Sequence, residues 1–169
     1  MDIKIGNIKY SSTLEAFIAY SPDPTIEKTK GTFLGTMGPF GFKVSCIVKN
    51  SKEGITRLEK GYGKSLNAEN IHTVLETYLG AKNDKEIALA KYYVKKLKEI
   101  EAFFEKQTEF HFFGSSLLFI SDQENLDTSS AKVRVIDFEH TYPAEGKIDE
   151  NFLFGLRNVR KLFEKFIEN

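Results

Sequence analysis

The alternation of apolar and polar positions divides the chain into short strands and two long amphipathic helices. Phe42 to Lys49 is rich in β-branched residues between a glycine and an asparagine, which predicts a strand, and a second strand is expected at Ile55 to Lys60. Apolar residues then recur at three- and four-residue steps from about Asp84 toward Lys106, and again from Glu150 to Glu168. Both segments predict helices with one apolar face.

Three shorter elements complete the predicted pattern. Asn67 can cap a helix over Ala68 to Leu79, because its side chain can accept hydrogen bonds from the first free backbone N–H groups. Gly80 follows that helix, where a left-handed residue is tolerated. Two further strands are expected at Phe112 to Ser121 and at Val133 to Phe138, joined by a polar loop too long for a tight turn.

The second of these strands ends in an acidic and aromatic cluster. The run KVRVIDFEHT has apolar residues at both odd and even positions, so the strand is expected to be buried on both faces. Asp137 would then lie in apolar surroundings unless a cation or hydrogen bonds hold its carboxylate. Asp137 is therefore a candidate metal ligand, and the alternative is an acid that caps the strand end or a following turn.

Composition limits the classes of function. The 169 residues are 41% hydrophobic and 28% charged, as in an ordinary globular domain. Lys plus Arg equals Asp plus Glu at 24 each, so net charge does not favour nucleic-acid binding, and any anion site must be local. Cys46 is the only cysteine, which excludes an internal disulfide and fits an intracellular location. No apolar run approaches the length of a membrane span.

An acid and a base lie two residues apart at the start of the chain. If DIKIG is a strand, Asp2 and Lys4 point to the same face. The acid could orient or deprotonate an attacking hydroxyl while the ammonium neutralises a phosphoryl group, and the alternative is a surface ion pair. Ser116 could contact a phosphate or satisfy the backbone at a strand start. His140 could take part in proton or phosphate chemistry, or lie at the surface.

Several common sites are not indicated by the sequence. No two of the three histidines share a metal-ligand spacing, so a zinc site is not supported. The chain has neither a GxGxxG fingerprint nor a GxxxxGK[ST] loop, so a nucleotide would not be bound by a Rossmann unit or a P-loop. A G-x-S-x-G elbow for acyl transfer is also missing.

Taken in order, the short motifs resemble those of the inositol polyphosphate kinases. That family carries a P-x-x-x-D-x-K-x-G motif, a G-[FY]-R strand, a Y-G-[RK]-x-L element, an S-S-L-L strand, an I-D-F-x-H-[TV] strand end and a D-x-x-[FY]-[LV]-x-G-L-x-N helix. The matching positions here are Asp2, Lys4, Gly6, Gly41 to Lys43, Tyr62 to Lys64, Leu66, Ser115 to Leu118, Ile136 to Phe138, His140, Thr141, Asp149, Leu153, Gly155, Leu156 and Asn158. The resemblance covers essentially the whole chain and points most closely to the multikinase or hexakisphosphate-kinase branches.

The resemblance implies an α+β fold like the C-terminal lobe of a protein kinase, with an antiparallel sheet packed against helices. It also implies transfer of the γ-phosphate of ATP to an inositol polyphosphate. Asp2 would engage the accepting hydroxyl and Lys4 the transferred phosphate, while Asp137 would hold Mg²⁺ with Ser116 on the nucleotide-phosphate side. The lysines expected to bind the substrate phosphates are Lys28, Lys30, Lys43, Lys60 and Lys64, and solvated surface lysines are the alternative. His140 would face the substrate.

The chain departs from the family pattern in two places. It begins one residue before Asp2, so the motif proline and the small β-rich lobe that would hold the nucleotide are not in this sequence. Cys46 stands where relatives usually have glycine. We therefore expect one domain over residues 1–169, with a short substrate-binding segment at about 11–40, located in the cytoplasm, the nucleus or both. The alternative is a catalytically silent module that binds inositol phosphates or another protein.

Overall fold

The computed structural model describes residues 1–11, 16–19, 35–52, 54–122 and 124–169. Within these ranges a five-stranded antiparallel sheet has the order β5-β4-β1-β7-β8. Its strands are β1 (Asp2–Ile5), β4 (Phe42–Ser51), β5 (Gly54–Leu58), β7 (Ser116–Ile120) and β8 (Lys132–Ile136). Two-stranded sheets are formed by β2 (Ile8–Ser11) with β3 (Ala16–Ala19), and by β6 (Phe110–Phe112) with β9 (Thr141–Pro143).

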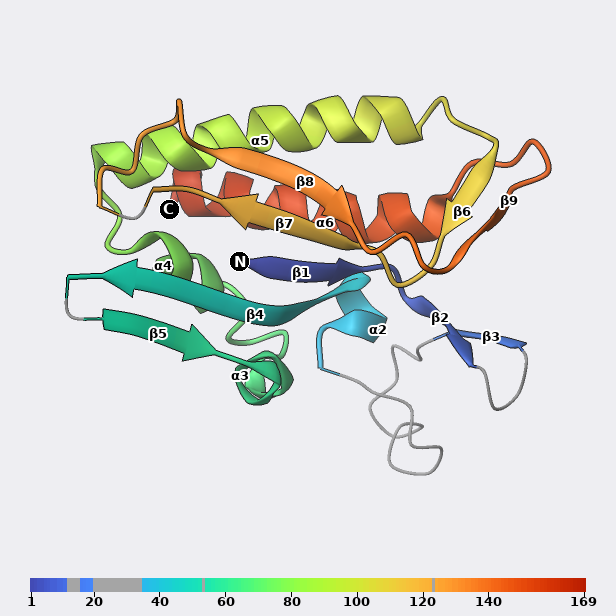
Figure 1. Cartoon of the computed structure of the whole chain (residues 1–169), viewed down its shortest axis with the longest axis horizontal. Coiled ribbons are helices and arrows are strands. Elements are labelled where there is room, and N and C mark those ends of the chain that lie inside the picture. Colours follow the sequence, from blue (N-terminus) through green and yellow to red (C-terminus); the bar gives the residue numbers. More distant parts are fainter. Residues whose placement is uncertain (12–15, 20–34, 53, 123) are drawn as a thin grey trace.

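Two long helices cover one face of the five-stranded sheet. α5 (Asp84–Phe104) and α6 (Glu150–Glu168) lie side by side behind β1, β7 and β8 (Figure 1), and α4 (Thr73–Leu79) continues this layer toward β4. Alternate strand residues such as Ile3, Leu117 and Phe119 are almost fully buried beneath the helices. The expected antiparallel sheet packed against helices is therefore confirmed.

All three predicted helices are present, but one of them begins later in the sequence than predicted. α5 and α6 match the two amphipathic segments, and the Gly80 backbone N–H closes α4 by donating to Glu76. The predicted helix over 68–79 starts later, at Thr73, because the Asn67 side chain accepts from the backbone of Glu69 and forms a turn instead. Two short helices, α2 (Met37–Phe40) and α3 (Lys60–Ser65), were not predicted.

Strand boundaries also differ from expectation near α3 and β7. The strand expected at 55–60 stops at Leu58, because Lys60 already opens α3. The strand expected at 112–121 is divided into β6 and β7, and Gly114 between them has a φ of 73° that favours glycine. β7 and β8 pair antiparallel as expected, with Ser116 opposite Ile136.

β8 is not buried on both faces, contrary to the sequence prediction. It is the last strand of the sheet, Val133 faces the helices, and Arg134 is exposed. An edge strand leaves part of its apolar surface to solvent, so an apolar run of this length does not require burial on both sides. Of the helices in the described ranges, none has the length and apolar character needed to cross a bilayer.

Candidate functional site: a lysine-lined pocket beside two carboxylates

The polar residues of β1 and β7 gather on the sheet face that carries no long helix. Lys4 lies opposite Ser116 in the β1–β7 register, and Asp2 is two residues away on the same strand face. Ser116 in turn lies opposite Ile136, the residue before Asp137. Asp2, Lys4, Ser116 and Asp137 are thereby brought together. The spacing at the start of the chain had predicted the shared face of Asp2 and Lys4, and the family resemblance had implied the other two.

Asp2 is half-buried, and its carboxylate is held in unfavourable surroundings. Burial raises the pKa of Asp2 above its usual value, and the charge of Asp137 raises it further, while Ser116 and Lys4 oppose the shift. The Oδ1 atom of Asp2 is buried without a hydrogen-bond partner among the described residues. An acceptor of this kind is available to a proton donor or a cation.

Asp137 is exposed, so the expectation of a buried carboxylate is wrong. The residue lies just beyond the end of the edge strand β8, in the left-handed region with a φ of 65°. The Ser115 hydroxyl donates a 3.0 Å hydrogen bond to the Asp137 backbone oxygen and holds this turn against β7. The left-handed backbone carries the chain away from the sheet, which leaves the side chain in solvent beside Asp2.

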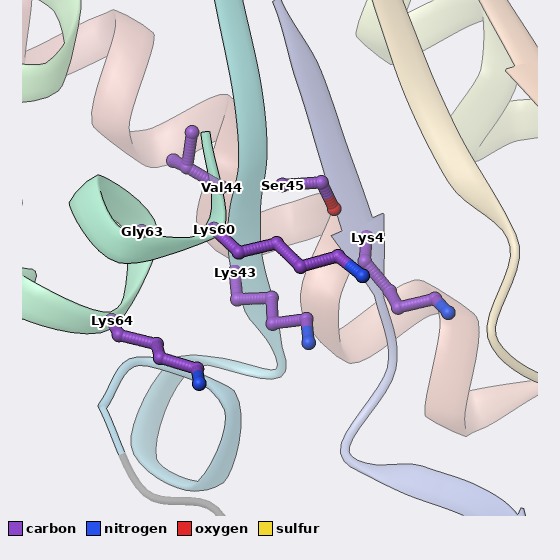
Figure 2. A pocket seen from close by; sticks show the side chains of 7 residues that line it. All are labelled: Lys4, Lys43, Val44, Ser45, Lys60, Gly63 and Lys64. Carbon is purple, nitrogen blue, oxygen red and sulfur yellow. The ribbon is translucent and has the colours of Figure 1, made fainter. Parts of the chain in front are cut away.

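A pocket of about 210 Å³ lies beside β1 and includes Lys4, which shares its strand face with Asp2. Its charged lining consists of Lys4 from β1, Lys43 from β4, and Lys60 and Lys64 from α3 (Figure 2). We call it the lysine pocket. Among the residues that the structure describes, no carboxylate lines the pocket, so these residues form a local site of positive potential in a chain with no net charge.

Ser45 also lines the lysine pocket, and sequence reasoning missed it. Ile3 pairs with Val44 but Asp2 pairs with Cys46, so Ser45 is an extra residue in β4. A β-bulge of this kind re-aims side chains and often lies at a functional site. The only signal in the sequence was Cys46 at a position expected to hold glycine, which indicated altered local packing.

Gly63 allows α3 to approach β4 closely enough to complete the pocket. A Cβ atom built on Gly63 would lie 1.8 Å from the backbone oxygen of Val44, which no side chain can tolerate without movement. α3 therefore packs with its backbone against β4 and places Lys60 and Lys64 beside Lys43. Lys4 reaches the pocket from β1. Its Nζ would lie 3.6 Å from a Cβ atom added to Gly114, so the absence of a side chain at Gly114 leaves room for it.

The remaining predicted residues that the structure describes do not line this pocket. His140 is partly exposed next to β9, and its backbone oxygen accepts a hydrogen bond from Phe113, but its side chain does not line the lysine pocket. Lys28 and Lys30 lie outside the described residues, as does most of the expected substrate-binding segment. Ser116 is buried beside Asp2.

The residues at this site fit a divalent cation held jointly with a ligand. In the ranges that the structure describes, no group of three or more His, Cys, Asp or Glu residues could hold a metal alone. Mg²⁺ is normally bound through one or two carboxylates together with phosphate oxygens and water. The exposed Asp137 would supply one such carboxylate, and Asp2 lies close enough for the two charges to interact.

Comparison with known proteins establishes the family. A family model described as inositol polyphosphate kinase matches residues 1–164, and the chain belongs to this family. The inositol polyphosphate multikinase of rice (Oryza sativa subsp. indica) is 30% identical over 179 residues, which cover 95% of this chain and 58% of that protein. Multikinase alpha of Arabidopsis thaliana is 26% identical over 190 residues, which cover all of this chain and 64% of that protein. The chain therefore spans about three fifths of the length of these relatives.

Solved structures of the same family share the fold. The inositol phosphate multikinase of S. cerevisiae, in complex with ADP and Mn²⁺, has a TM-score of 0.75 at 22% identity and matches 98% of this chain and 77% of that chain. A second inositol phosphate multikinase structure has a TM-score of 0.73 at 23% identity and matches 98% of this chain and 78% of that one. The resemblance inferred from the motifs is confirmed.

Proposed function

We propose that this chain binds an inositol polyphosphate in the lysine pocket and takes part in ATP-dependent transfer of a phosphoryl group to it. One observation carries the proposal: Lys4 belongs both to the lysine pocket and to the strand face that holds Asp2 and Ser116. A phosphorylated ligand in the pocket would therefore lie next to the carboxylates. Phosphoryl transfer depends mainly on positioning and charge stabilisation, which such an arrangement can supply.

The lysine pocket suits a ligand with several phosphate groups. An ammonium group interacts with phosphate as a compact charge with rotatable donors, so lysines from several elements can adapt to different phosphate positions. Lys60 and Lys64 are exposed, so each single contact with a phosphate would be weak in water. Binding is therefore expected to depend on the four lysines together and to weaken with salt.

The carboxylates would serve the transfer step. Asp2, whose pKa is raised by burial, would accept a hydrogen bond from the attacking hydroxyl and orient it. Lys4 would hold the transferred phosphate, and Asp137 and Ser116 would face the nucleotide phosphates with Asp137 as a metal ligand. Bound Mg²⁺ would neutralise negative charge on the phosphates during transfer. The nucleotide and Mn²⁺ bound by the yeast relative support this assignment.

The exposure of Asp137 favours a second candidate, a module that binds inositol phosphates without transferring phosphate. A carboxylate in open solvent holds a cation weakly, because water competes for both groups. In that case the lysine pocket would function alone, and Asp2 and Asp137 would contribute nothing to ligand affinity.

Two measurements on the 169-residue chain test the proposal. Isothermal titration with inositol hexakisphosphate should show saturable binding that is weakened about tenfold in Lys60→Ala/Lys64→Ala, since each exposed charge pair contributes roughly half to one kcal/mol. The matched control is Lys91→Ala/Lys95→Ala, two exposed lysines of α5 outside the lysine pocket, which should bind normally. Equal affinities in the two variants would contradict the assignment of the lysine pocket.

Phosphate transfer is measured separately, with γ-labelled ATP, Mg²⁺ and a panel of inositol phosphates. Label should appear in the inositol phosphate and should fall by at least about a hundredfold in Asp137→Asn, which keeps the size of the side chain but removes the charge that binds the metal. Binding of inositol hexakisphosphate should be unchanged in that variant. Binding without any transfer would show that the 169-residue chain by itself acts as the second candidate describes.

A further inference from the structure

A second pocket lies on the helix side of the sheet, and nothing in the proposed function uses it. It has a volume of about 240 Å³ and is formed by α2, the start of β4, the turn before α4 and the C-terminal half of α6. We call it the α6 pocket. It is separate from the lysine pocket because neighbouring residues of β4 point in opposite directions: Phe42 lines the α6 pocket, and Lys43 lines the lysine pocket.

The floor of the α6 pocket is apolar. Phe42, Ile71 and Leu162 each have less than 9% of their surface exposed, and the ring centroids of Phe40 and Phe42 are 6.1 Å apart. These residues come from distant parts of the sequence, so the apolar floor exists only in the folded chain. An apolar body inserted here would replace contact with water by contact with aromatic and aliphatic carbon.

The rim of the α6 pocket carries cationic and titratable basic side chains. Lys161 and Lys165 lie one turn apart on α6, and His72 lies across from them on the turn before α4. In the described part of the chain, neither lysine has an ion pair within 4 Å. The acid between them in sequence, Glu164, instead binds Arg160 and Lys98. Like charges one turn apart repel each other, and a bound anion would relieve that repulsion.

Asn158 adds a polar group at a fixed position on the wall. Its side-chain nitrogen donates a 3.1 Å hydrogen bond to the backbone oxygen of Phe40, which joins α6 to α2. This contact holds the wall against the aromatic floor. No carboxylate is present among the described residues that line the pocket, so the combination of floor and rim favours a negative head group on an apolar body.

We propose that the α6 pocket binds a small amphiphilic anion, namely a monocarboxylate with a short aliphatic or aromatic body. The volume is below the range of about 300 to 1,000 Å³ that is typical of pockets for drug-sized ligands, so the occupant is a small molecule. Its apolar body packs on Phe40, Phe42 and Leu162, and its carboxylate lies between Lys161 and Lys165. The proposal does not depend on the kinase function.

The test is a titration of the methyl-labelled chain, followed by NMR through the methyl groups of Ile71 and Leu162. Hexanoate is the probe, and 1-hexanol is the uncharged control with the same carbon chain. Hexanoate should shift both methyl signals saturably and bind at least about fivefold more tightly than 1-hexanol, because only the carboxylate engages the lysines. No saturable shift up to the solubility limit of hexanoate, or equal affinity of the two probes, would overturn the proposal.

Two variants locate the binding. Lys161→Glu/Lys165→Glu should weaken hexanoate binding by about tenfold or more and leave 1-hexanol binding unchanged. The control Lys91→Glu/Lys95→Glu places the same charge reversal on exposed positions of α5 and should change neither. Ala68→Phe fills the pocket from an exposed position and should abolish binding of both probes while the melting temperature is kept. Normal hexanoate binding by the Lys161→Glu/Lys165→Glu variant would show that the rim lysines do not bind the carboxylate.

Discussion

Asp2 combines the chemical role proposed for it with a cost to folding. Its carboxylate is half-buried, has an unpaired oxygen, and lies within the electrostatic range of Asp137. Burial and the neighbouring charge both oppose ionisation, so the folded protein holds the Asp2 proton to a higher pH than the unfolded chain does. A residue that destabilises the fold in its charged form is typical of a functional site, where other requirements determine the side chain.

The pH dependence of stability follows from the direction of this shift. Below the ordinary pKa of 3.8, Asp2 is protonated in both states and contributes no penalty. Between pH 3.8 and the higher pKa of the folded state, the unfolded chain has released this proton while the folded protein still holds it. The free energy of unfolding therefore falls as the pH rises through this interval. The penalty of Asp2 is therefore fully present near neutral pH.

We predict that Asp2→Asn raises the melting temperature at pH 7 by about 1 to 3 °C, because it removes the charge and keeps the shape. Thermal unfolding at pH 7 and at pH 3 measures the effect, and the gain should disappear at pH 3. Glu69→Gln, at an exposed acid of the turn before α4, is the control and should change neither value. An equal gain at both pH values would show that the charge of Asp2 is not its cause.

At single residues, the sequence predicted local geometry better than burial. The spacing in DIKIG placed Asp2 and Lys4 on one face, because strand geometry fixes that relation without reference to the rest of the fold. Asp137 was assigned to buried surroundings, yet it is exposed. Its surroundings depend on the position of β8 at the sheet edge, and strand order is a property of pairing between distant segments.

At the level of elements, the contact between α3 and β4 determines the shape of the lysine pocket. Both α3 lysines reach the pocket only because Gly63 brings the helix backbone against Val44. Gly61, two residues earlier in the same helix, would have nothing within 4 Å of an added Cβ. An alanine substitution at Gly63 therefore tests the close contact with β4, and the same substitution at Gly61 tests helix propensity alone.

We predict that Gly63→Ala destabilises the chain by about 1 to 3 kcal/mol, the usual cost of overpacking. The displaced α3 should also weaken binding of inositol hexakisphosphate by about tenfold, since two of the four lysines move. Gly61→Ala should be neutral or stabilising by up to about 1 kcal/mol, because alanine is the better helix former. Urea unfolding and titration calorimetry measure the two effects, and equal behaviour of the variants would refute the close-contact argument.

Element types were predictable from the sequence because periodicity alone carries them, as the match of α5 and α6 shows. Boundaries were less predictable where a single side chain competes with the backbone. Asn67 delayed the start of α4, and Gly114 divided one predicted strand into β6 and β7. α3 was missed because KGYGKS carries no apolar stripe. Its helix is stabilised by packing against β4, which the local sequence does not reveal.

At the level of the whole molecule, the sheet separates stability from the candidate chemistry. The face that α5 and α6 cover (Figure 1) holds the apolar core. The opposite face carries Asp2, Lys4 and Ser116. The two long helices are joined by ion pairs as well as by apolar packing. Glu101 of α5 accepts from Arg157 at 3.0 Å and from Arg160 at 2.8 Å, and only 13% of its side chain is exposed.

This division predicts that the helix layer can be weakened without loss of ligand binding. Glu101→Ala should destabilise the chain by about 1 to 3 kcal/mol in urea unfolding. The substitution removes the most buried of the carboxylates that pair with Arg157 and Arg160. Lys96→Ala removes the more exposed Lys96–Glu99 pair and should change stability by less than about 0.5 kcal/mol. Below the unfolding transition, Glu101→Ala should bind inositol hexakisphosphate within about twofold of the unmodified chain, since Glu101 lies across the sheet from the lysine pocket. A larger loss of affinity would mean that the helix layer positions the lysines, and the separation between the two faces would then be incorrect.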